Sequence, residues 1–234
     1  MNLHVLGCAG GIGGRERLTT CMLIDHDILL DAGTGLATLS IDQLINIDHV
    51  FLTHGHLDHV VGLTLLVDAI QGKKSGTVYV HATEQIISML KKHLFNWALW
   101  PDFTEIPDAD HGVFQWVPME VGSSLEINGR IITSHAVNHT AGSVAYRLDG
   151  GKDAFVFTGD MCSTPELWLA LMREENIKKV IVDCSFTNDD DALAARSKHF
   201  CPRSLIDDIR DMPESVEFLI YHLKPGQEER IMNE

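Results

Sequence analysis

The chain has 234 residues, of which 45% are hydrophobic and 22% are charged. This composition excludes wholesale disorder, and the length suffices for one sizeable core or at most two small ones. The net charge of −15 at pH 7 argues against tight nonspecific binding to nucleic-acid backbones, which requires a surplus of Lys and Arg facing the phosphates. Bound divalent cations would invert that field locally, so a small anionic substrate is compatible with the acidic charge.

The cysteines and the first residues bear on the compartment. There are five cysteines, an odd number, and no two form a CxxC pair, which argues against a disulfide framework and favours a reducing environment. No signal peptide is apparent, because the first residues already resemble a strand. No apolar run is long enough to span a bilayer. We therefore expect a cytoplasmic protein without a membrane partner.

Hydrophobic periodicity predicts an alternation of strands and helices within a single domain over 1–234. Strands are expected, in chain order, at 2–6, 20–24, 27–30, 48–52, 77–81, 113–117, 124–127, 130–135, 143–148, 154–157, 179–182 and 216–220. Helices are expected at 60–70, 84–93, 166–174 and 202–210. Two β-rich halves with crossover helices predict two sheets face to face with helices outside.

A glycine-rich loop over 7–14 follows the first predicted strand. A dinucleotide-binding loop would be followed by a helix, but Thr19 and Thr20 lead into another strand, so that interpretation fails. The loop is instead predicted to let the backbone pass close to the rim of an active site.

The segment THGHLDH, residues 53–59, places three histidines and an aspartate within a few positions. It lies between a predicted buried strand and a predicted helix, and ligands at alternating positions of such a loop converge on one side. We interpret it as a metal site rather than as a polar loop that happens to be rich in His. Because His54 and His56 alone leave a zinc ion under-coordinated, further ligands are needed.

Three later segments each bring a metal-capable residue to the end of a predicted strand. They are NHTAGS with His139, FTGD with Asp160, and IYH with His222. One such residue at a strand end would usually be structural. Three of them together complement the first motif.

These four motifs, in this order, resemble the metallo-β-lactamase fold superfamily over most of the chain. The resemblance implies an α/β fold, an αββα sandwich of two mixed β-sheets with helices on the outer faces, and a dinuclear metal site at one edge. The implied ligands are His54, His56 and His139 for one metal, Asp58, His59 and His222 for the other, and Asp160 as a bridge between the two. His135 is a rival for the third histidine, but the context HTAGS favours His139.

The chemistry of such a pair follows from its donors. Two metals roughly 3.5–4 Å apart can share a hydroxide near neutral pH and clamp the attacked centre. Seven N and O ligands without thiolate favour two zinc ions, with manganese or iron as alternatives. Asp31, at the end of a predicted strand, either orients a ligating histidine or caps the turn at Gly33.

The choice among hydrolases rests on four further segments, because the fold alone hosts many activities. They are LGCAGG at 6–11, FNWALWPDFTEIP at 95–107, SFTN through SKH at 185–199, and HLKP at 222–225. They resemble class II cyclic-nucleotide phosphodiesterases. This implies that a metal-bridging hydroxide opens 3′,5′-cyclic nucleotides to 5′-monophosphates. Trp97, Trp100 and Phe103 are core or a dimer patch, or one of them stacks on a nucleobase.

His199 is the most informative residue outside the implied ligands. In the related tRNA-processing nucleases, a His in a corresponding helix-capping stretch assists the leaving oxygen. The resemblance therefore implies that His199 is a general acid, with Asp58 as an alternative proton carrier. Those nucleases pair that His with an acid three residues before the bridging Asp, where this chain has Phe157. Asp183 is expected to serve instead.

Several alternatives stay open at this stage. A tRNA 3′-end nuclease is disfavoured by the acidic charge and by the absence of a long basic arm, which argues against tRNA as a partner. A thioesterase, lactonase or lactamase of the same fold is a second alternative, and a di-iron redox or metal-binding protein is a different class. A small anionic substrate is expected, and a homodimer is open. Lys224, close to His222, either neutralises a phosphate oxygen of that substrate or is a solvated surface side chain.

Overall fold

The computed structural model describes residues 1–234 and divides into two compact units. The first unit comprises residues 1–8 and 14–119, and the second comprises 9–13 and 120–234. Each unit contains one sheet of six strands, in which neighbours in space are also neighbours in sequence order. That the whole chain acts as a single hydrolase domain stays a prediction.

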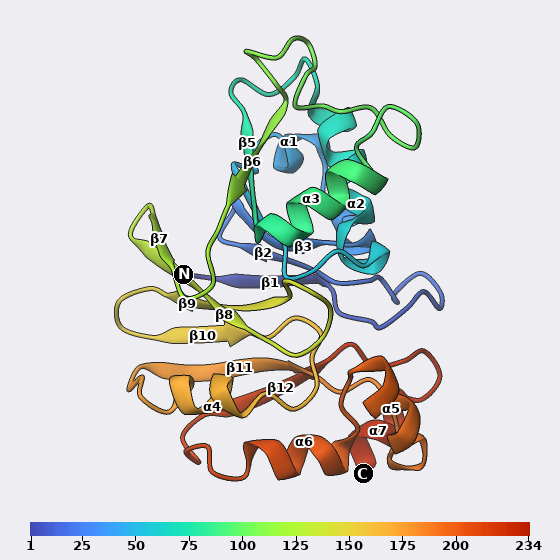
Figure 1. The fold of residues 1–234 in the computed structure, drawn as a ribbon, viewed down its shortest axis with the longest axis vertical. Coiled ribbons are helices and arrows are strands. Elements are labelled where there is room, and N and C mark those ends of the chain that lie inside the picture. The colour runs from blue at the N-terminus through green and yellow to red at the C-terminus, as the bar shows by residue number, and fades with distance from the viewer. The chain divides into compact units, whose positions relative to one another are not determined.

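The first sheet begins with antiparallel strands and continues with parallel ones. Its strands are β1 (Leu3–Gly7), β2 (Cys21–Ile24), β3 (Ile28–Ala32), β4 (His49–Phe51), β5 (Val78–Ala82) and β6 (Phe114–Pro118). Pairs β1–β2 and β2–β3 are antiparallel, and the pairs from β3 to β6 are parallel. The helices of this unit are η1 (Thr34–Thr38), α1 (Ile41–Leu44), α2 (Leu57–Ile70) and α3 (Glu84–His93). They lie in the crossovers that parallel neighbours require (Figure 1).

Burial on both faces explains why the central strands β3 and β4 consist mostly of apolar residues. Leu29 and Val50 belong to a core cluster with Leu63 and Val67 of α2. Phe51, which follows Val50 and so points to the opposite face, is fully buried as well. A parallel sheet covered on both faces selects such sequences rather than an alternation of apolar and polar residues.

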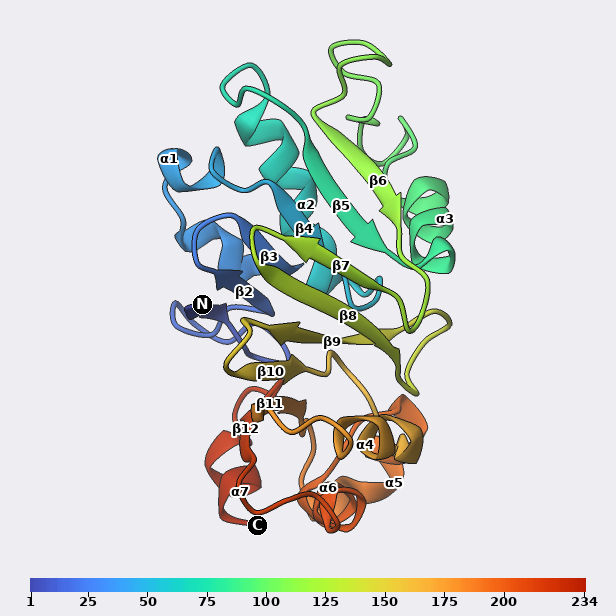
Figure 2. The same cartoon turned by 90° about the vertical axis from the view of Figure 1, so that its left-hand side faces the viewer.

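The second sheet also mixes both directions. Its strands are β7 (Ser124–Ile127), β8 (Arg130–Ala136), β9 (Val144–Asp149), β10 (Ala154–Phe157), β11 (Ile177–Asp183) and β12 (Glu217–Tyr221). Strands β7 to β10 are antiparallel, and β10 to β12 are parallel. The helices are α4 (Pro165–Leu171), η2 (Asn188–Asp190), α5 (Asp191–Ser197), α6 (Pro202–Ile209) and α7 (Glu228–Asn233). The β7–β8 hairpin, seen in Figure 2, turns at Asn128 and Gly129, both with positive φ, as the Asn-Gly pair predicts.

The predicted elements are confirmed with differences at some ends. All twelve strands are present within two residues of their predicted bounds. The helix predicted over 166–174 ends at Leu171, and the helix predicted from residue 60 begins at Leu57. The sequence pattern missed η1, α1, η2, α5 and α7, each of three to seven residues. Helices of one or two turns contain too few residues for a periodicity to stand out.

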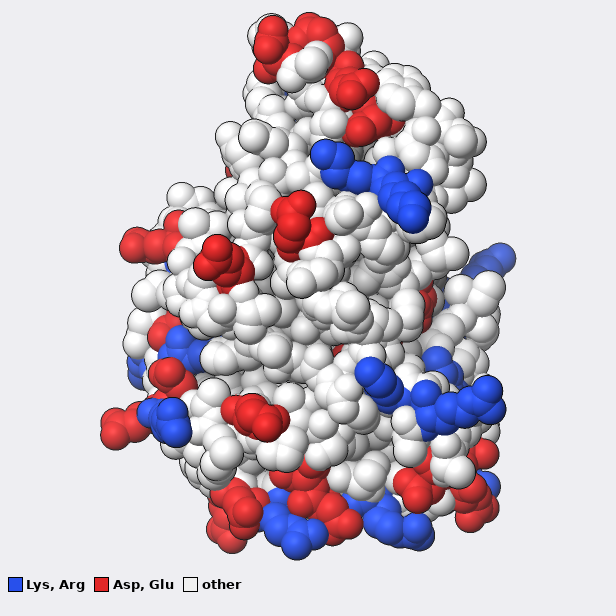
Figure 3. All heavy atoms as spheres, viewed as in Figure 1, with Lys and Arg blue, Asp and Glu red and all other residues white.

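Two further features of the molecule concern its surface and its cysteines. All five cysteines are free. No helix combines the length and the apolarity needed to cross a bilayer. Acidic and basic side chains lie interspersed on the face that Figure 3 shows.

Candidate metal centre

The first unit carries its metal-capable residues on the β4–α2 connection. His54 is fully buried just after β4, and His56 is the N-cap residue of α2. Asp58 and His59 therefore lie in the first turn of the helix, not in the predicted loop. A carboxylate in that position is favoured by the helix dipole, so the earlier helix start suits Asp58.

Asp31 of β3 organises this segment. Its buried carboxylate accepts hydrogen bonds from the backbone N–H of Thr53 and the Thr53 hydroxyl, each 2.8 Å long, and from His59 Nδ1 at 2.7 Å. Of the two interpretations of Asp31, orienting a histidine is thus the one that its contacts match. Burial raises the pKa of Asp31, while the charge and hydrogen bond of His59 and the bonds from Thr53 act in the opposite direction.

Glycine allows α2 to approach the end of β3 closely. A Cβ atom on Gly33 would lie 2.1 Å from the carbonyl oxygen of Asp58, and one on Gly62 would lie 2.5 Å from the carbonyl oxygen of Gly33. Neither position can therefore hold a larger residue without moving the helix. This close contact keeps His59 within reach of Asp31.

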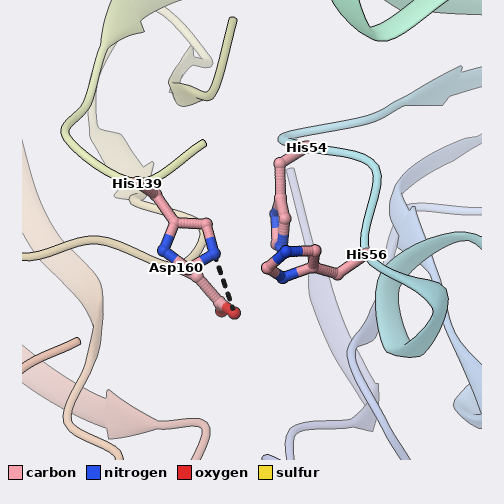
Figure 4. A group of neighbouring side chains, drawn as sticks. All are labelled: His54, His56, His139 and Asp160. Atoms are coloured by element: carbon pink, nitrogen blue, oxygen red, sulfur yellow. Dashed lines mark ion pairs between the residues drawn. The ribbon is translucent and has the colours of Figure 1, made fainter. Parts of the chain in front are cut away.

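The second unit carries its metal-capable residues at three strand ends, as predicted. His139 follows β8, Asp160 follows β10, and His222 follows β12 with a left-handed φ of 64°. Asp160 Oδ2 lies 3.3 Å from His222 Nε2 and 3.9 Å from His139 Nε2, the ion pair drawn in Figure 4. His135, the rival ligand, lies within β8 and is outside this group.

Four histidines use Nδ1 to donate to an oxygen of their own unit. His59 donates to the Asp31 carboxylate, and His139 donates to the carbonyl of Lys198 at 3.0 Å. His54 lies 3.0 Å from the Thr53 hydroxyl, and His222 lies 2.9 Å from the Ser185 hydroxyl. Both hydroxyls already donate to a carboxylate, so each accepts from the histidine.

This arrangement fixes the tautomer of each ring. With the proton on Nδ1, Nε2 carries the lone pair that a metal binds. Figure 4 shows His54 and His56 edge to face, their ring centroids 4.7 Å apart. Imidazole nitrogens in the right tautomer, together with the carboxylates, form a donor set that fits zinc or a similar divalent ion.

His199 has the carboxylate partner that the sequence suggested. Its Nδ1 lies 2.7 Å from Asp183 Oδ2, and Asp183 also accepts from Ser185 at 2.6 Å and from the N–H of Met161 at 3.2 Å. Burial acts to lower the pKa of His199. The hydrogen bond and charge of Asp183, with the charge of Asp160, outweigh burial and leave this pKa above its ordinary value.

The group around His199 allows a second interpretation. Ligand atoms of Asp160, His199 and His222 all lie within 4.8 Å of one another, so His199 itself has the position of a ligand. Thr53, Ser185 and Tyr221 were not predicted as site residues, and the Tyr221 hydroxyl donates to Asp160 Oδ1 at 3.0 Å. Thr53 and Tyr221 adjoin the predicted ligands His54 and His222, which is the signal that could have identified them. Ser185 has no such neighbour among the predicted ligands.

The three aromatic residues of 95–107 separate in the structure. Phe103 is buried in the core of the first unit. Trp100 is partly buried and donates from its indole nitrogen to the carbonyl of Thr64 at 3.1 Å. Trp97 is 61% exposed and has a left-handed φ of 62°. The core interpretation is therefore correct for Phe103 and wrong for Trp97.

Comparisons with known proteins agree with this architecture. A family model described as “Beta-lactamase superfamily domain” matches residues 26–222. A probable 3′,5′-cyclic-nucleotide phosphodiesterase of Yersinia pestis is 23% identical over 207 residues, which cover 77% of this chain and 58% of that protein. The metallo-beta-lactamase fold protein YhfI of Bacillus subtilis has a TM-score of 0.77 at 19% identity, over 99% of this chain and 90% of that one. Unliganded yeast PDE1 has a TM-score of 0.78 at 17% identity, over 95% of this chain and 87% of that one.

The likeness to solved structures extends over nearly the whole chain and confirms the predicted fold. The chain spans little more than half of the Yersinia relative, so that protein's activity does not transfer by similarity alone. The family match, by contrast, covers all the predicted metal ligands, because it extends from the strand that contains Asp31 to His222. The chain therefore belongs to the beta-lactamase superfamily.

Proposed function

We propose that this protein is a dinuclear metal-dependent hydrolase that opens 3′,5′-cyclic nucleotides to 5′-monophosphates. The observation that carries the proposal is the donor set, in which four histidines are held through Nδ1, so that Nε2 carries the lone pair that a metal binds. Among the activities of this fold, similarity to the probable 3′,5′-cyclic-nucleotide phosphodiesterase of Yersinia pestis favours a cyclic phosphodiester as the substrate.

Seven residues would hold the metals. We assign His54, His56 and His139 to one ion, Asp58, His59 and His222 to the other, and Asp160 to a bridging position. Two bound divalent ions would supply an activated water and stabilise the charge that develops at phosphorus. The N and O donors favour zinc, with manganese or iron as alternatives.

His199 would donate a proton to the departing 3′-oxygen. Asp183 holds its Nδ1, so the ring presents Nε2 away from that carboxylate. Its pKa lies above the ordinary value, chiefly because the hydrogen bond and charge of Asp183 outweigh burial, and this favours the protonated ring that a general acid requires. Asp58, whose side chain is 31% exposed, is the alternative proton carrier.

The direct test is turnover by purified protein loaded with zinc or manganese. We expect cyclic AMP or cyclic GMP to give the 5′-monophosphate, followed by chromatography and ³¹P NMR. The same preparation would be given a tRNA precursor, an acyl thioester, a lactone and nitrocefin, which represent the alternative activities. Full metal occupancy without turnover of any cyclic nucleotide would refute the proposal, and two iron atoms in the purified protein would favour a redox role.

The general acid has a test of its own. His199→Ala should slow hydrolysis of a cyclic nucleotide strongly, by about 10²–10⁴-fold, because the ribose oxygen needs a proton to leave. It should affect bis(p-nitrophenyl) phosphate far less, because p-nitrophenolate leaves without one. Equal losses on both substrates, with the metal content reduced, would make His199 a ligand instead.

The setting of the enzyme is part of the proposal. We propose a single hydrolase domain over 1–234 that acts on a small anionic substrate in the cytoplasm, without tRNA or membrane partners, and we leave a homodimer to be tested. Cell fractionation would test the location, and analytical ultracentrifugation would test the oligomeric state.

A further inference from the structure

We infer that Lys224 binds a phosphate oxygen of the substrate, and that Gly10 and Phe186 hold its ammonium group in place for this purpose. The inference rests on the proposed function, since it names what that site would select. It assigns the site to anionic phosphoesters rather than to neutral esters, lactones or lactams.

Lys224 makes two contacts through its ammonium group. The residue is partly buried, and its Nζ donates to the carbonyl oxygen of Gly10 at 2.9 Å. The same Nζ lies 5.7 Å from the centroid of the Phe186 ring, within the range of a cation–π contact. An ammonium group has three N–H donors, and Gly10 takes one, so donors remain for an anion.

The glycine-rich loop brings this lysine to the candidate ligands. The N–H of Gly10 donates to the carbonyl of Leu223 at 3.0 Å. A Cβ atom on Gly10 would lie 2.3 Å from the carbonyl oxygen and 2.9 Å from Nδ1 of His222. Gly10 thus packs directly against His222, and its carbonyl places the ammonium group beside this histidine. The close backbone approach predicted for the loop is found here, within the second unit.

Phe186 connects Lys224 with His199. The centroids of the Phe186 and His199 rings are 5.7 Å apart, so the lysine and the candidate general acid contact the same ring. A phosphate beside His199 would therefore lie within the field of Lys224.

The electrostatics of the chain give this lysine its importance. The net charge is −15, and Asp160 and Asp183 lie buried beside the same two histidines. A phosphodiester is anionic and gains further negative charge during hydrolysis, whereas an ester or lactone begins neutral. A compact ammonium charge at the site therefore favours the phosphate substrate specifically.

The test compares Lys224→Met and Lys224→Arg with wild-type protein loaded with zinc. Binding of inorganic phosphate would be measured by isothermal titration, hydrolysis of bis(p-nitrophenyl) phosphate by absorbance, and metal content by mass spectrometry. We expect Lys224→Met to weaken phosphate binding and raise KM by about tenfold to a hundredfold with unchanged metal, and Lys224→Arg to recover part of the loss. Hydrolysis of p-nitrophenyl acetate, if present, should change less than twofold.

A matched control is Lys178→Met, which removes the same charge from an exposed position on β11. It sits near the opposite end of this strand from Asp183 and should leave every readout unchanged. Phosphate binding by Lys224→Met equal to wild type would overturn the inference, and so would loss of metal, which would show that Lys224 only supports His222. If wild-type protein cleaves no phosphodiester, the proposed function fails, yet the binding measurement still decides the role of Lys224.

Discussion

Each unit contains the same hydrogen-bonding device, a buried carboxylate and a hydroxyl that together accept hydrogen bonds from two histidines. The two units differ in the roles that we propose for those histidines. In the first unit, the buried carboxylate of Asp31 accepts from the Thr53 hydroxyl and from His59, and the hydroxyl accepts from His54. In the second unit, a buried carboxylate at the end of β11 also accepts from a hydroxyl and a histidine, and this hydroxyl also accepts from a further histidine. The corresponding residues there are Asp183, Ser185, His199 and His222.

In this comparison, His199 of the second unit corresponds to His59 of the first unit. Both donate from Nδ1 to a carboxylate oxygen at 2.7 Å, but only His59 is among the seven proposed metal ligands. Asp31 would thus hold a ligand directly, whereas Asp183 would hold a proton donor directly and the ligand His222 only through Ser185. In the first device, Thr53, His54 and His59 belong to one short segment, and only Asp31 lies 22 to 28 positions away. The second device includes a hydrogen bond between residues 37 positions apart. We therefore expect the two to respond differently to substitution.

The largest effect is expected at Asp160, where the histidines of the second unit converge. Asp160→Asn keeps the shape of the side chain but removes the charge that faces His139 and His222. We expect metal content to fall below that of wild type and activity to fall by more than the roughly 10–100-fold that loss of an outer partner brings. Asp153→Asn, exposed in the same unit, is the control. Unchanged metal content would contradict the bridging assignment.

Next in size is the contrast between Asp31→Asn and Asp183→Asn, which tests the comparison itself. Asp31→Asn should weaken metal binding by about 10–100-fold, because the tautomer of a ligating His59 is no longer fixed. Asp183→Asn should lower kcat for cyclic nucleotides and weaken metal binding less than Asp31→Asn, because Asp183 reaches the proposed ligand His222 only through Ser185. Metal titration with a chromophoric chelator would measure both losses of affinity. If the two variants lose metal affinity equally, His199 is a ligand and the two devices are equivalent.

A smaller effect on metal binding is expected at Gly10, where the glycine-rich loop packs against His222. Gly10→Ala places a methyl group 2.3 Å from the carbonyl oxygen of His222, so this histidine must shift. Gly11→Ala meets only side-chain atoms of Pro225, at 3.3 and 3.4 Å, which can move aside. We expect Gly10→Ala to weaken metal binding by about tenfold and Gly11→Ala to change it little. Equal behaviour of the two variants would show that the loop does not position His222.

The difference between the devices also explains how much the sequence could predict. The strands were predictable because the core selects long apolar runs, and THGHLDH was conspicuous because its residues are consecutive. Thr53 was open to prediction on the same grounds, since it adjoins His54. The pairing of β11 with β12 in parallel, with Asp183 opposite Tyr221, is a tertiary event that brings Ser185 to His222. No local pattern records that register.

The loops show the same limit. The glycines over 7–14 predict a close backbone approach, but the sequence does not say which residue is approached. That this is His222 depends on the bridge between Ala9 and Leu223. Lys224 was left between a phosphate ligand and a solvated side chain for the same reason, because its contact with Gly10 joins positions 214 residues apart.

The smallest expected effect is on the free energy of unfolding. Its dependence on pH should differ between a buried histidine of the first unit and a less buried histidine of the second. His81 of β5 is 3% exposed, stacks on Phe51 and lies 3.0 Å from His49, and burial together with the His49 charge lowers its pKa to about 3. An unfolded histidine takes up a proton as the pH falls below about 6.5, whereas folded His81 stays neutral until about 3, so folding loses up to ~1.4 kcal/mol per pH unit in that window.

His135 of β8 offers the matched case in the second unit. Its pKa is lowered by burial and by Arg147, with Glu174 acting against them, but the residue is only partly buried. Urea unfolding of metal-free protein between pH 4 and 6.5 should therefore show a shallower loss of stability for His81→Gln than for wild type, and a lesser change for His135→Gln. Since the remaining histidines are common to all three proteins, their protonation cancels from the differences. A His81→Gln slope equal to that of wild type would mean that the folded protein protonates His81, and that burial in the first sheet is less complete than its packing implies.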